Sequence, residues 1–281
     1  MPIILRKPVT PGQRGMSVNR QALTRKRPER ALTQRLTKHA GRDRFGHISI
    51  RHRGGGNKRL YRLMSSLERG TDSTATILSL EYDPNRSATI ALILYPDGSK
   101  AYILAGAEMT VGQVLTAGPA AEVKPGNRLP LGTIPRGHAI FDIALDPNRT
   151  GQMVRSAGSS AEITAHEDDG RYAQVKLPSG EIRRILSTAY ATIGTVSNPE
   201  HSAVTIGKAG RRRHMGWRPE VRGKAMNPND HPHGGGEGSN SIGLKYPKTP
   251  WGKHALGTKT RRSKRTNVFI LKSRHEGRRS S

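Results

Sequence analysis

The chain has 281 residues, a formal net charge of +27 and no cysteine. The lack of cysteine excludes disulfides, thiolate metal sites and cysteine nucleophiles, and so large a charge predicts a stoichiometric polyanionic partner. Hydrophobic residues make up 33% and aromatic residues 4% of the chain, so much of it cannot bury a core of its own. No apolar run reaches membrane-spanning length, and no signal-peptide core follows Met1. We therefore expect a soluble, cytoplasmic, nucleic-acid-bound protein with no membrane partner.

The positive charge is concentrated at the two ends of the chain. Residues 1–70 carry a net charge of +15, residues 201–281 also carry +15, and residues 71–200 between them carry −3. This division predicts an ordinary globular middle flanked by two polycationic arms.

The N-terminal arm is interrupted by proline and glycine and has no sustained apolar period. Residues 31–39 could form a short helix, but with Leu32 and Leu36 as its only large apolar side chains such a helix has little to bury. Residues 51–59, with the sequence RHRGGGNKR, combine cations with three glycines that let backbone N–H groups reach phosphate or sugar. The arm is either a disordered basic tail or an ordered clasp for RNA. The glycines favour the clasp, because a plain tail needs only charge.

The sequence pattern in the middle of the chain predicts two small β-barrels. Short β-branched or aromatic runs, separated by turn residues, lie at 75–82, 88–95 and 101–104, and Val111, Val114 and Leu115 continue the pattern. These runs suit an antiparallel barrel of the OB type. A second set begins near Asn127 and predicts an SH3-like barrel, with candidate strands at 139–145, 153–154, 161–164, 172–177 and 181–186. Without a long amphipathic helix, an α/β enzyme fold is not expected.

The C-terminal arm begins near Gly207 and ends in basic runs at 259–265 and in a basic tail to Ser281. It holds both tryptophans of the chain, Trp217 and Trp251. Two interpretations stand open for them: a platform on which a base stacks, or a wedge that packs the arm on itself.

Residues 226–238 of this arm contain two prolines and four glycines, which rule out a regular helix or a central strand. Asp230, His231, His233 and Glu237 form the only cluster of potentially reactive side chains. The two histidines do not match the helical spacing of zinc ligands, and no second cluster completes a first shell, so no metal site is expected. Either histidine could act as a general base, but no nucleophile or cofactor fingerprint accompanies them. The pattern favours a loop that lies against RNA, its histidines donating to phosphate or 2′-OH.

Several segments of the chain resemble one known family, the universal large-subunit ribosomal protein L2 (uL2) family in its bacterial form. The most specific are residues 221–238, VRGKAMNPNDHPHGGGEG, and 250–252, PWG; further matching segments are 51–59, 82–92, 154–158, 177–181, 191–194 and 207–211. The resemblance covers nearly the whole chain.

The resemblance implies a mainly β fold, with an OB-fold barrel followed by an SH3-like barrel and long basic irregular extensions at both ends. The expected limits are 1–60 for the N-terminal extension, 61–126 for the OB-fold domain, 127–197 for the SH3-like domain and 198–281 for the C-terminal extension.

The resemblance also implies a function and its partners. It implies a structural constituent of the large subunit in the cytoplasmic ribosome, which binds 23S-type rRNA and supports subunit association, tRNA binding and the peptidyl transferase centre. Implied partners are large-subunit rRNA, neighbouring ribosomal proteins, the small subunit at an intersubunit bridge and, indirectly, tRNA. No enzyme activity and no cofactor are expected. His231 corresponds to a histidine discussed as a contributor to peptide-bond formation, and we interpret it as a residue that positions RNA.

The residues expected to bind RNA lie mostly in the two arms. They are Arg51, His52, Arg53, Gly54, Gly55, Lys58, Arg59, Arg86, Arg155, Lys208, Arg211, Arg212, Arg213, Trp217, Arg222, Asn227, Asp230, His231, His233, Gly234, Gly235, Trp251, Lys259, Arg261, Arg262, Lys264 and Arg265.

Two other hypotheses are weighed against the ribosomal one. A hydrolase or transferase acting through the cluster at 230–237 gains nothing from so much excess charge. An architectural DNA-binding protein would be expected to show a recognition helix, and none is visible. The charge distribution favours an rRNA-binding protein, with arms that are disordered alone and fold on binding.

Overall fold

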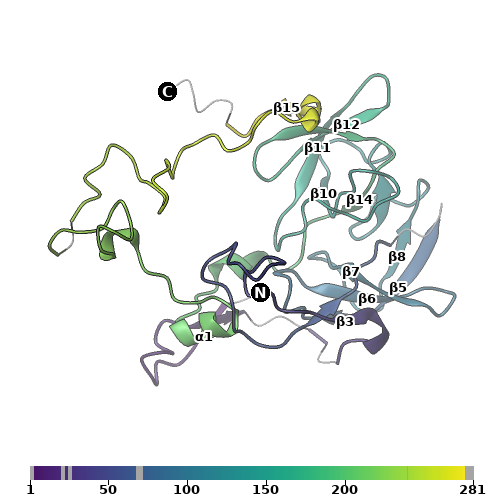
Figure 1. Cartoon of the computed structure of the whole chain (residues 1–281). Coiled ribbons are helices and arrows are strands. Elements are labelled where there is room, and N and C mark those ends of the chain that lie inside the picture. Colours follow the sequence, from purple (N-terminus) through teal and green to yellow (C-terminus); the bar gives the residue numbers. More distant parts are fainter. Residues whose placement is uncertain (1–2, 20–22, 25–26, 68–71, 239, 276–281) are drawn as a thin grey trace. The chain divides into compact units, whose positions relative to one another are not determined.

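A computed structural model describes residues 3–19, 23–24, 27–67, 72–238 and 240–275 (Figure 1). The chain divides into two compact units. The first unit comprises Met1–Thr37, Lys58–Lys208 and Thr266–Ser281, and the second comprises Lys38–Asn57 and Ala209–Arg265. Among the described residues, no helix has the length and apolarity needed to cross a membrane.

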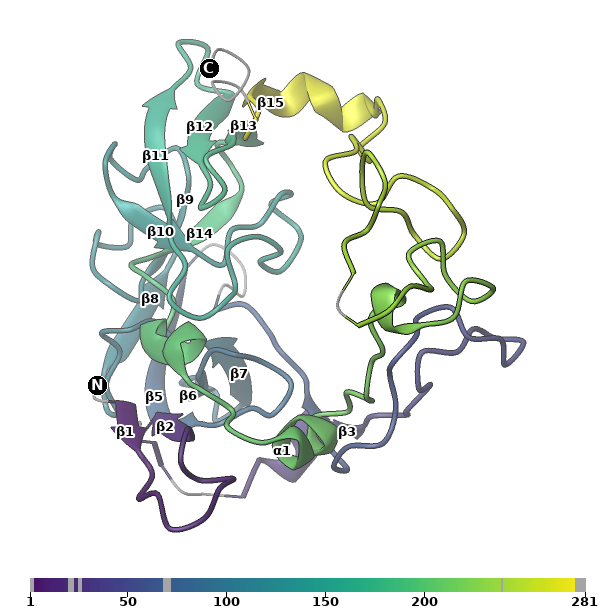
Figure 2. The ribbon, with the colours of Figure 1, turned by 90° about the vertical axis from the view of Figure 1, so that its left-hand side faces the viewer.

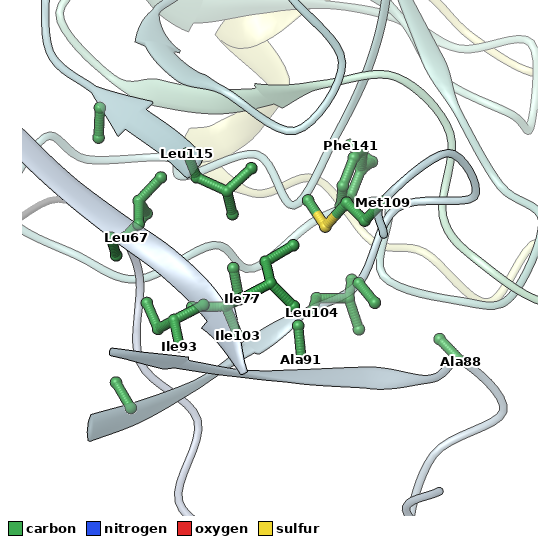
Figure 3. Packing of buried hydrophobic residues seen from close by; sticks show 14 of the residues in the cluster. Leu67, Ile77, Ala88, Ala91, Ile93, Ile103, Leu104, Met109, Leu115 and Phe141 are labelled. Atoms are coloured by element: carbon green, nitrogen blue, oxygen red, sulfur yellow. The ribbon is translucent and has the colours of Figure 1, made fainter. Parts of the chain in front are cut away.

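The first barrel of the first unit is built from four antiparallel strands in the order β8-β5-β6-β7. They are β5 (Ser73–Glu81), β6 (Ile90–Leu94), β7 (Lys100–Leu104) and β8 (Val114–Ala117). Buried residues recur at every second position of β5, as the two-residue period of a strand requires. Their side chains meet those of β6, β7 and β8 in an apolar core that includes Ile77, Ile93, Ile103 and Leu115 (Figure 3).

The segment before this barrel covers a second, outer face of the same strands. It contains a 3-10 turn, η1 (Arg30–Leu32), and strand β3 (Thr33–Arg35), which pairs with β4 (Leu60–Arg62). Residues 31–39 therefore do not form the short helix that their sequence would allow. Leu32 packs against a small buried cluster of β6 and β7, and pairing with the distant β4 draws the following residues into a strand.

Tyr102 lies at the centre of this outer cluster and is fully buried. Its hydroxyl donates to Oε2 of Glu81 at 2.8 Å and accepts the backbone N–H of Glu29 at 2.9 Å. Burial, together with the neighbouring Glu81 carboxylate, raises the pKa of Tyr102 to about 12. The phenol therefore stays neutral through the physiological range and holds the N-terminal segment to the barrel.

The second barrel is antiparallel, with its strands in the order β13-β12-β11-β10-β14-β9. Its strands are β9 (Arg128–Pro130), β10 (Ala139–Phe141), β11 (Ala161–His166), β12 (Tyr172–Lys176), β13 (Ile182–Leu186) and β14 (Tyr190–Ile193). Strand β14 was not among the expected strands. The expected fold class, a mainly β chain with an OB-fold barrel followed by an SH3-like barrel, is confirmed.

The two barrels meet at one edge, beside a buried ion pair of the second barrel in which Nη1 of Arg128 lies 3.3 Å from Oδ2 of Asp142. Strands β8 and β9 meet in parallel at one residue pair, Ala117 and Arg128. The guanidinium of Arg128 is buried and donates to the backbone oxygen of Asp142 at 2.8 Å and to Oγ1 of Thr192 at 3.1 Å. Phe141 of β10 packs into the core of the first barrel (Figure 3). The limits 61–126 and 127–197 for the two domains remain predictions.

The extensions contribute short elements of their own to the first unit. Strands β1 (Ile3–Leu5) and β2 (Ser17–Asn19) form a hairpin, and the 3-10 turn η2 (Pro199–Ala203) follows the second barrel. Near the other end of the chain, the 3-10 turn η4 (Arg265–Phe269) leads into β15 (Ile270–Lys272), which pairs with β13 (Figure 2). The second unit contains helix α1 (Ala209–His214) and the 3-10 turn η3 (Gly223–Ala225).

Candidate nucleic-acid interface

Within the second unit, the glycine-rich segment of the N-terminal arm lies against the start of the C-terminal arm. The N–H of Gly54 donates to the oxygen of Gly216 at 3.0 Å, and the N–H of Asn57 donates to the oxygen of His214 at 2.9 Å. In the other direction, the N–H of Arg218 donates to the oxygen of His52 at 3.0 Å. Two segments from opposite ends of the chain thus pair through their backbones. Sequence reasoning missed this pairing, because neither segment has an apolar period that would predict it.

The pairing requires glycine at position 56 and uses the backbone of Gly54. A methyl group on Gly56 would lie 2.8 Å from the backbone nitrogen of Gly216, and the φ of Gly56 is +79°. The N–H of Gly54 is already used in the pairing. Only Gly55 is exposed, with open space where a side chain would be. The backbone of this segment is therefore directed largely at its protein partner, with Gly55 left accessible to a ligand.

Trp217 lies inside the same junction. Its indole ring centroid is 3.3 Å from Cζ of Arg53 and 5.3 Å from Cζ of Arg212, and its backbone forms an isolated antiparallel bridge with Arg53. The side chain is 39% exposed. Of the two interpretations for this tryptophan, the geometry favours the wedge that packs the arm on itself; its contact with RNA remains a prediction.

Trp251 is presented differently, at the tip of a small hairpin. Lys248 and His254 form an antiparallel bridge, and the N–H of Thr249 donates to the oxygen of Lys253 at 2.7 Å. The side chain of Trp251 is 76% exposed. Cζ of Arg51 lies 5.5 Å from its ring centroid. The hairpin therefore holds an accessible aromatic surface beside a cation.

The proline- and glycine-rich loop at 226–238 is folded on itself. The N–H of Gly235 donates to the oxygen of Met226 at 3.1 Å, and the N–H of Gly234 donates to the oxygen of His231 at 2.8 Å. A methyl group on Gly234 would lie 2.2 Å from the oxygen of Asn227, so only glycine fits there. The loop has a defined shape of its own among the described residues.

Both histidines of the loop take part in folding it. His231 is 8% exposed, its ring lies against Gly223, and its Nδ1 accepts the N–H of His233 at 3.0 Å. Nε2 of His233 accepts the N–H of Lys248 at 2.8 Å, and the two imidazole centroids are 4.6 Å apart. Each imidazole thus uses one ring nitrogen to accept a backbone N–H. His231 fixes the loop, and His233 ties the loop to the hairpin of Trp251.

The potentially reactive side chains of the loop differ in their burial. Asp230 and Glu237 are exposed, whereas His231 is buried. No group of three or more His, Cys, Asp or Glu residues that could hold a metal ion occurs among the described residues. The buried His231 accepts a backbone N–H and so has a structural role within the loop.

Some of the residues expected to bind RNA have protein partners. Arg86 pairs with the fully buried carboxylate of Asp83 and lies over the ring of Tyr61, and Nε of Arg155 is 3.0 Å from Oδ1 of Asp142. Nη1 of Arg59 donates to the oxygen of Pro84 at 3.0 Å. These arginines stabilise the first unit, whatever contact they also make with RNA.

The other expected cations are mostly exposed, and most of them belong to the second unit. The exposed ones are Arg51, Lys58, Lys208, Arg212, Arg213, Arg222, Lys259, Arg261, Arg262, Lys264 and Arg265. One further candidate, absent from the residues expected to bind RNA, is the tip at residues 43–47. There Oδ1 of Asp43 accepts the N–H groups of Phe45 and His47, each at 2.9 Å, and Cζ of Arg44 lies 4.6 Å from the exposed ring of Phe45. A turn-forming Asp followed by Arg-Phe-Gly is a signal that could have predicted it.

Two β-barrels of the oligonucleotide-binding and SH3-like types, joined to exposed polycationic segments, define an RNA-binding scaffold protein. Residues 29–117 match the family described as Ribosomal Proteins L2, RNA binding N-terminal domain, and residues 124–252 match Ribosomal Proteins L2, C-terminal domain. The large ribosomal subunit protein uL2 of Maricaulis maris (strain MCS10) is 50% identical over 271 residues, which cover 96% of each chain. The chain belongs to the ribosomal protein L2 family. It is a structural ribosomal protein and not an enzyme.

Proposed function

We propose that the protein is a structural constituent of the large subunit in the cytoplasmic ribosome and binds 23S-type rRNA there. The observation that carries this proposal is the second unit. It is rich in exposed cations, and among its described residues only His231 is buried. A segment with so little core and so much charge gains its stability from a polyanion that neutralises it.

In this proposal the two units have different tasks. The barrels dock on RNA as rigid bodies, with Arg59, Arg86 and Arg155 shaping their surface through the partners described above. The exposed cations of the second unit contact phosphates, and Asn227, Asp230, Gly234 and Gly235 bring the backbone of the loop close to RNA. The proposed domain limits are those predicted from the sequence, 1–60, 61–126, 127–197 and 198–281.

The finer roles concern the loop at 226–238. We propose that it supports the organisation of the peptidyl transferase centre, and through it subunit association at an intersubunit bridge and tRNA binding, with neighbouring ribosomal proteins as further partners. The self-contained fold of the loop supports this proposal, because a preformed loop can position RNA without losing much entropy. His231 acts as a positioning residue, since its Nδ1 holds the N–H of His233 and its ring lies against Gly223.

The first test is sedimentation of ribosomes through rising salt. Purely electrostatic binding weakens as salt rises, with a logarithmic slope of roughly 0.9 or less for each phosphate contacted. We expect the protein to remain with the large subunit well beyond the salt that strips such contacts, because shape also holds it. Recovery of the protein in the supernatant at low salt would contradict the ribosomal proposal.

The second test compares His231→Ala with His231→Asn in assembled ribosomes. Asn can place its Oδ1 near the position of Nδ1 and accept the N–H of His233, whereas Ala cannot. We expect both variants to assemble, the Ala variant to lose peptide-bond formation, and the Asn variant to retain most of it. Equal loss in both variants, in particles that assemble normally, would assign chemistry to the imidazole and overturn the positioning role.

A further inference from the structure

The two tryptophans of the chain are held in opposite ways, and this difference separates their roles. Trp217 has its ring against Arg53 at 3.3 Å and has Arg212 at 5.3 Å, so protein cations already occupy its surroundings. Trp251 has one cation, Arg51, at the longer distance of 5.5 Å and is 76% exposed. An indole that packs against a partner gains free energy from the large apolar area that it buries. Because Trp251 is so exposed, most of this free energy is still available for binding.

The exposed indole is also held in place. The N–H of Gly252 donates to the oxygen of Thr249 at 2.9 Å, the N–H of Lys253 donates to Oγ1 of Thr249 at 3.1 Å, and the φ of Gly252 is +77°. At the base of the hairpin, the rings of Tyr246 and His254 are 4.1 Å apart. The N–H of Lys248 is bound by His233 of the neighbouring loop. A hairpin closed at tip and base presents its aromatic surface with little entropy left to lose on binding.

We propose that Trp251, with Arg51 beside it, forms a stacking site for one unpaired base of RNA. This inference deepens the proposed function and rests on it. Bases in a duplex are stacked on their neighbours and offer no free face, whereas an unpaired base can stack on an aromatic side chain. Trp217 has no such role; it fastens the two arms together.

The charges around the hairpin select a nucleotide over an apolar protein partner. Cζ of Arg51 lies 5.5 Å from the ring centroid, and from there the guanidinium can donate to the phosphate of the stacked nucleotide or stack against its base. Lys253, two residues beyond Trp251, is exposed as well. The base of a nucleotide supplies a π-face for Trp251, and its phosphate supplies a negatively charged partner for Arg51 and Lys253.

The affinity test uses the full-length chain and two RNA probes of equal charge. One is a single-stranded oligoadenylate of about twelve nucleotides, within the range of sites bound by single-strand binders, and the other is the same ribose-phosphate backbone without bases. For Trp251→Ala we expect the affinity for the base-bearing probe to fall by about 5- to 150-fold, as loss of one stacked base predicts. The affinity for the abasic probe should not change. Trp251→Phe keeps a π-face and should stay within about threefold of the parent chain for the base-bearing probe.

Fluorescence gives a second readout that does not depend on affinity. Because the chain has two tryptophans, Trp217→Phe leaves Trp251 as the sole reporter, and Trp251→Phe leaves Trp217. We expect the oligoadenylate, and not the abasic probe, to quench Trp251, and neither probe to quench Trp217 in this base-dependent way. Should Trp217→Phe fail to fold, the difference between the parent chain and Trp251→Phe supplies the same signal.

The possible failures are distinguishable. If the parent chain binds the oligoadenylate and Trp251→Ala binds it equally well, the stacking site is disproved while RNA binding stands. Equal quenching of Trp251 by the two probes would likewise overturn base stacking. If the parent chain binds neither the oligoadenylate nor large-subunit rRNA at physiological salt, the proposed function itself fails.

Discussion

The two compact units of this protein are held together by different forces. Every buried hydrophobic residue in the described part of the chain lies between Leu67 and Val196, in the barrel cores or on the covered outer face of the first barrel. The second unit is held by backbone hydrogen bonds, close glycine contacts and cation–π contacts between arginines and tryptophans, and not by an apolar core. Hydrogen bonds contribute only about 1 kcal/mol each to stability in water, and exposed cation–π pairs contribute about 0.5–1 kcal/mol. The barrels can therefore fold alone, whereas the second unit depends on a partner for much of its stability.

The largest effect should come from opening the core of the first barrel. Leu115→Ala removes a fully buried side chain, and we expect unfolding of the barrel to require about 3–5 kcal/mol less free energy. Val114→Ala, at the adjacent position that is 60% exposed, is the matched control and should change stability by less than about 0.5 kcal/mol. Denaturant unfolding of the full chain measures both. Equal effects would show that the barrel is not held by its core.

A smaller effect should come from ionising Tyr102. Its folded-state pKa is raised from 10.0 to about 12, so the stabilisation is fully present below pH 10 and is lost as the pH rises from 10 towards 12. A shift of this size corresponds to about 2–3 kcal/mol. We expect unfolding free energy to fall over this window in the parent chain and to fall less in Tyr102→Phe. Titration by tyrosinate absorbance should show one late group that the variant lacks; parallel curves for the two chains would contradict the assignment.

The smallest effect should appear where the two arms meet. Gly56→Ala places a methyl group 2.8 Å from the nitrogen of Gly216 and also strains a backbone with positive φ. Gly55→Ala strains a backbone with positive φ but brings its methyl group close to no other atom. That strain alone is about 1–2 kcal/mol. We expect trypsin to cut near Arg51 and Arg53 sooner in Gly56→Ala than in Gly55→Ala, with barrel unfolding unchanged in both. Identical cleavage would mean that the arms are already apart in the free protein.

The barrels could be predicted from the sequence because each strand has a local pattern of alternating or β-branched residues. The alternation in Tyr172–Lys176 and the β-branched runs at 88–95 and 101–104 lead to strands at nearly the expected positions. The exceptions are instructive. Residues 31–39 have few apolar side chains and would allow a short helix, yet Thr33–Arg35 form strand β3 because they pair with Leu60–Arg62. Tertiary pairing overrode a weak local preference.

The candidate site was predictable in its residue types and not in its connections. Charge and glycine content point to the segments at 51–59 and 207–265, but nothing local says that Gly56 faces Gly216. The buried ion pair of Arg128 and Asp142 was missed for the same reason, because the sequence around each residue predicts an exposed charge and does not indicate its partner. The separate roles of Trp217 and Trp251 likewise depend on which arginine the fold brings to each ring.

Strand β15 has a topological consequence for how this protein enters a ribosome. By pairing with β13, it returns the chain to the unit that it left at Lys208, so residues 209–265 form a loop anchored at both ends. An anchored loop samples fewer states than a free tail of equal length, so under the proposed function it loses less entropy when RNA orders it. Such a loop also cannot enter a folded RNA end first. Either the RNA closes around it during assembly, or the short β13–β15 pairing opens to let the end of the chain pass.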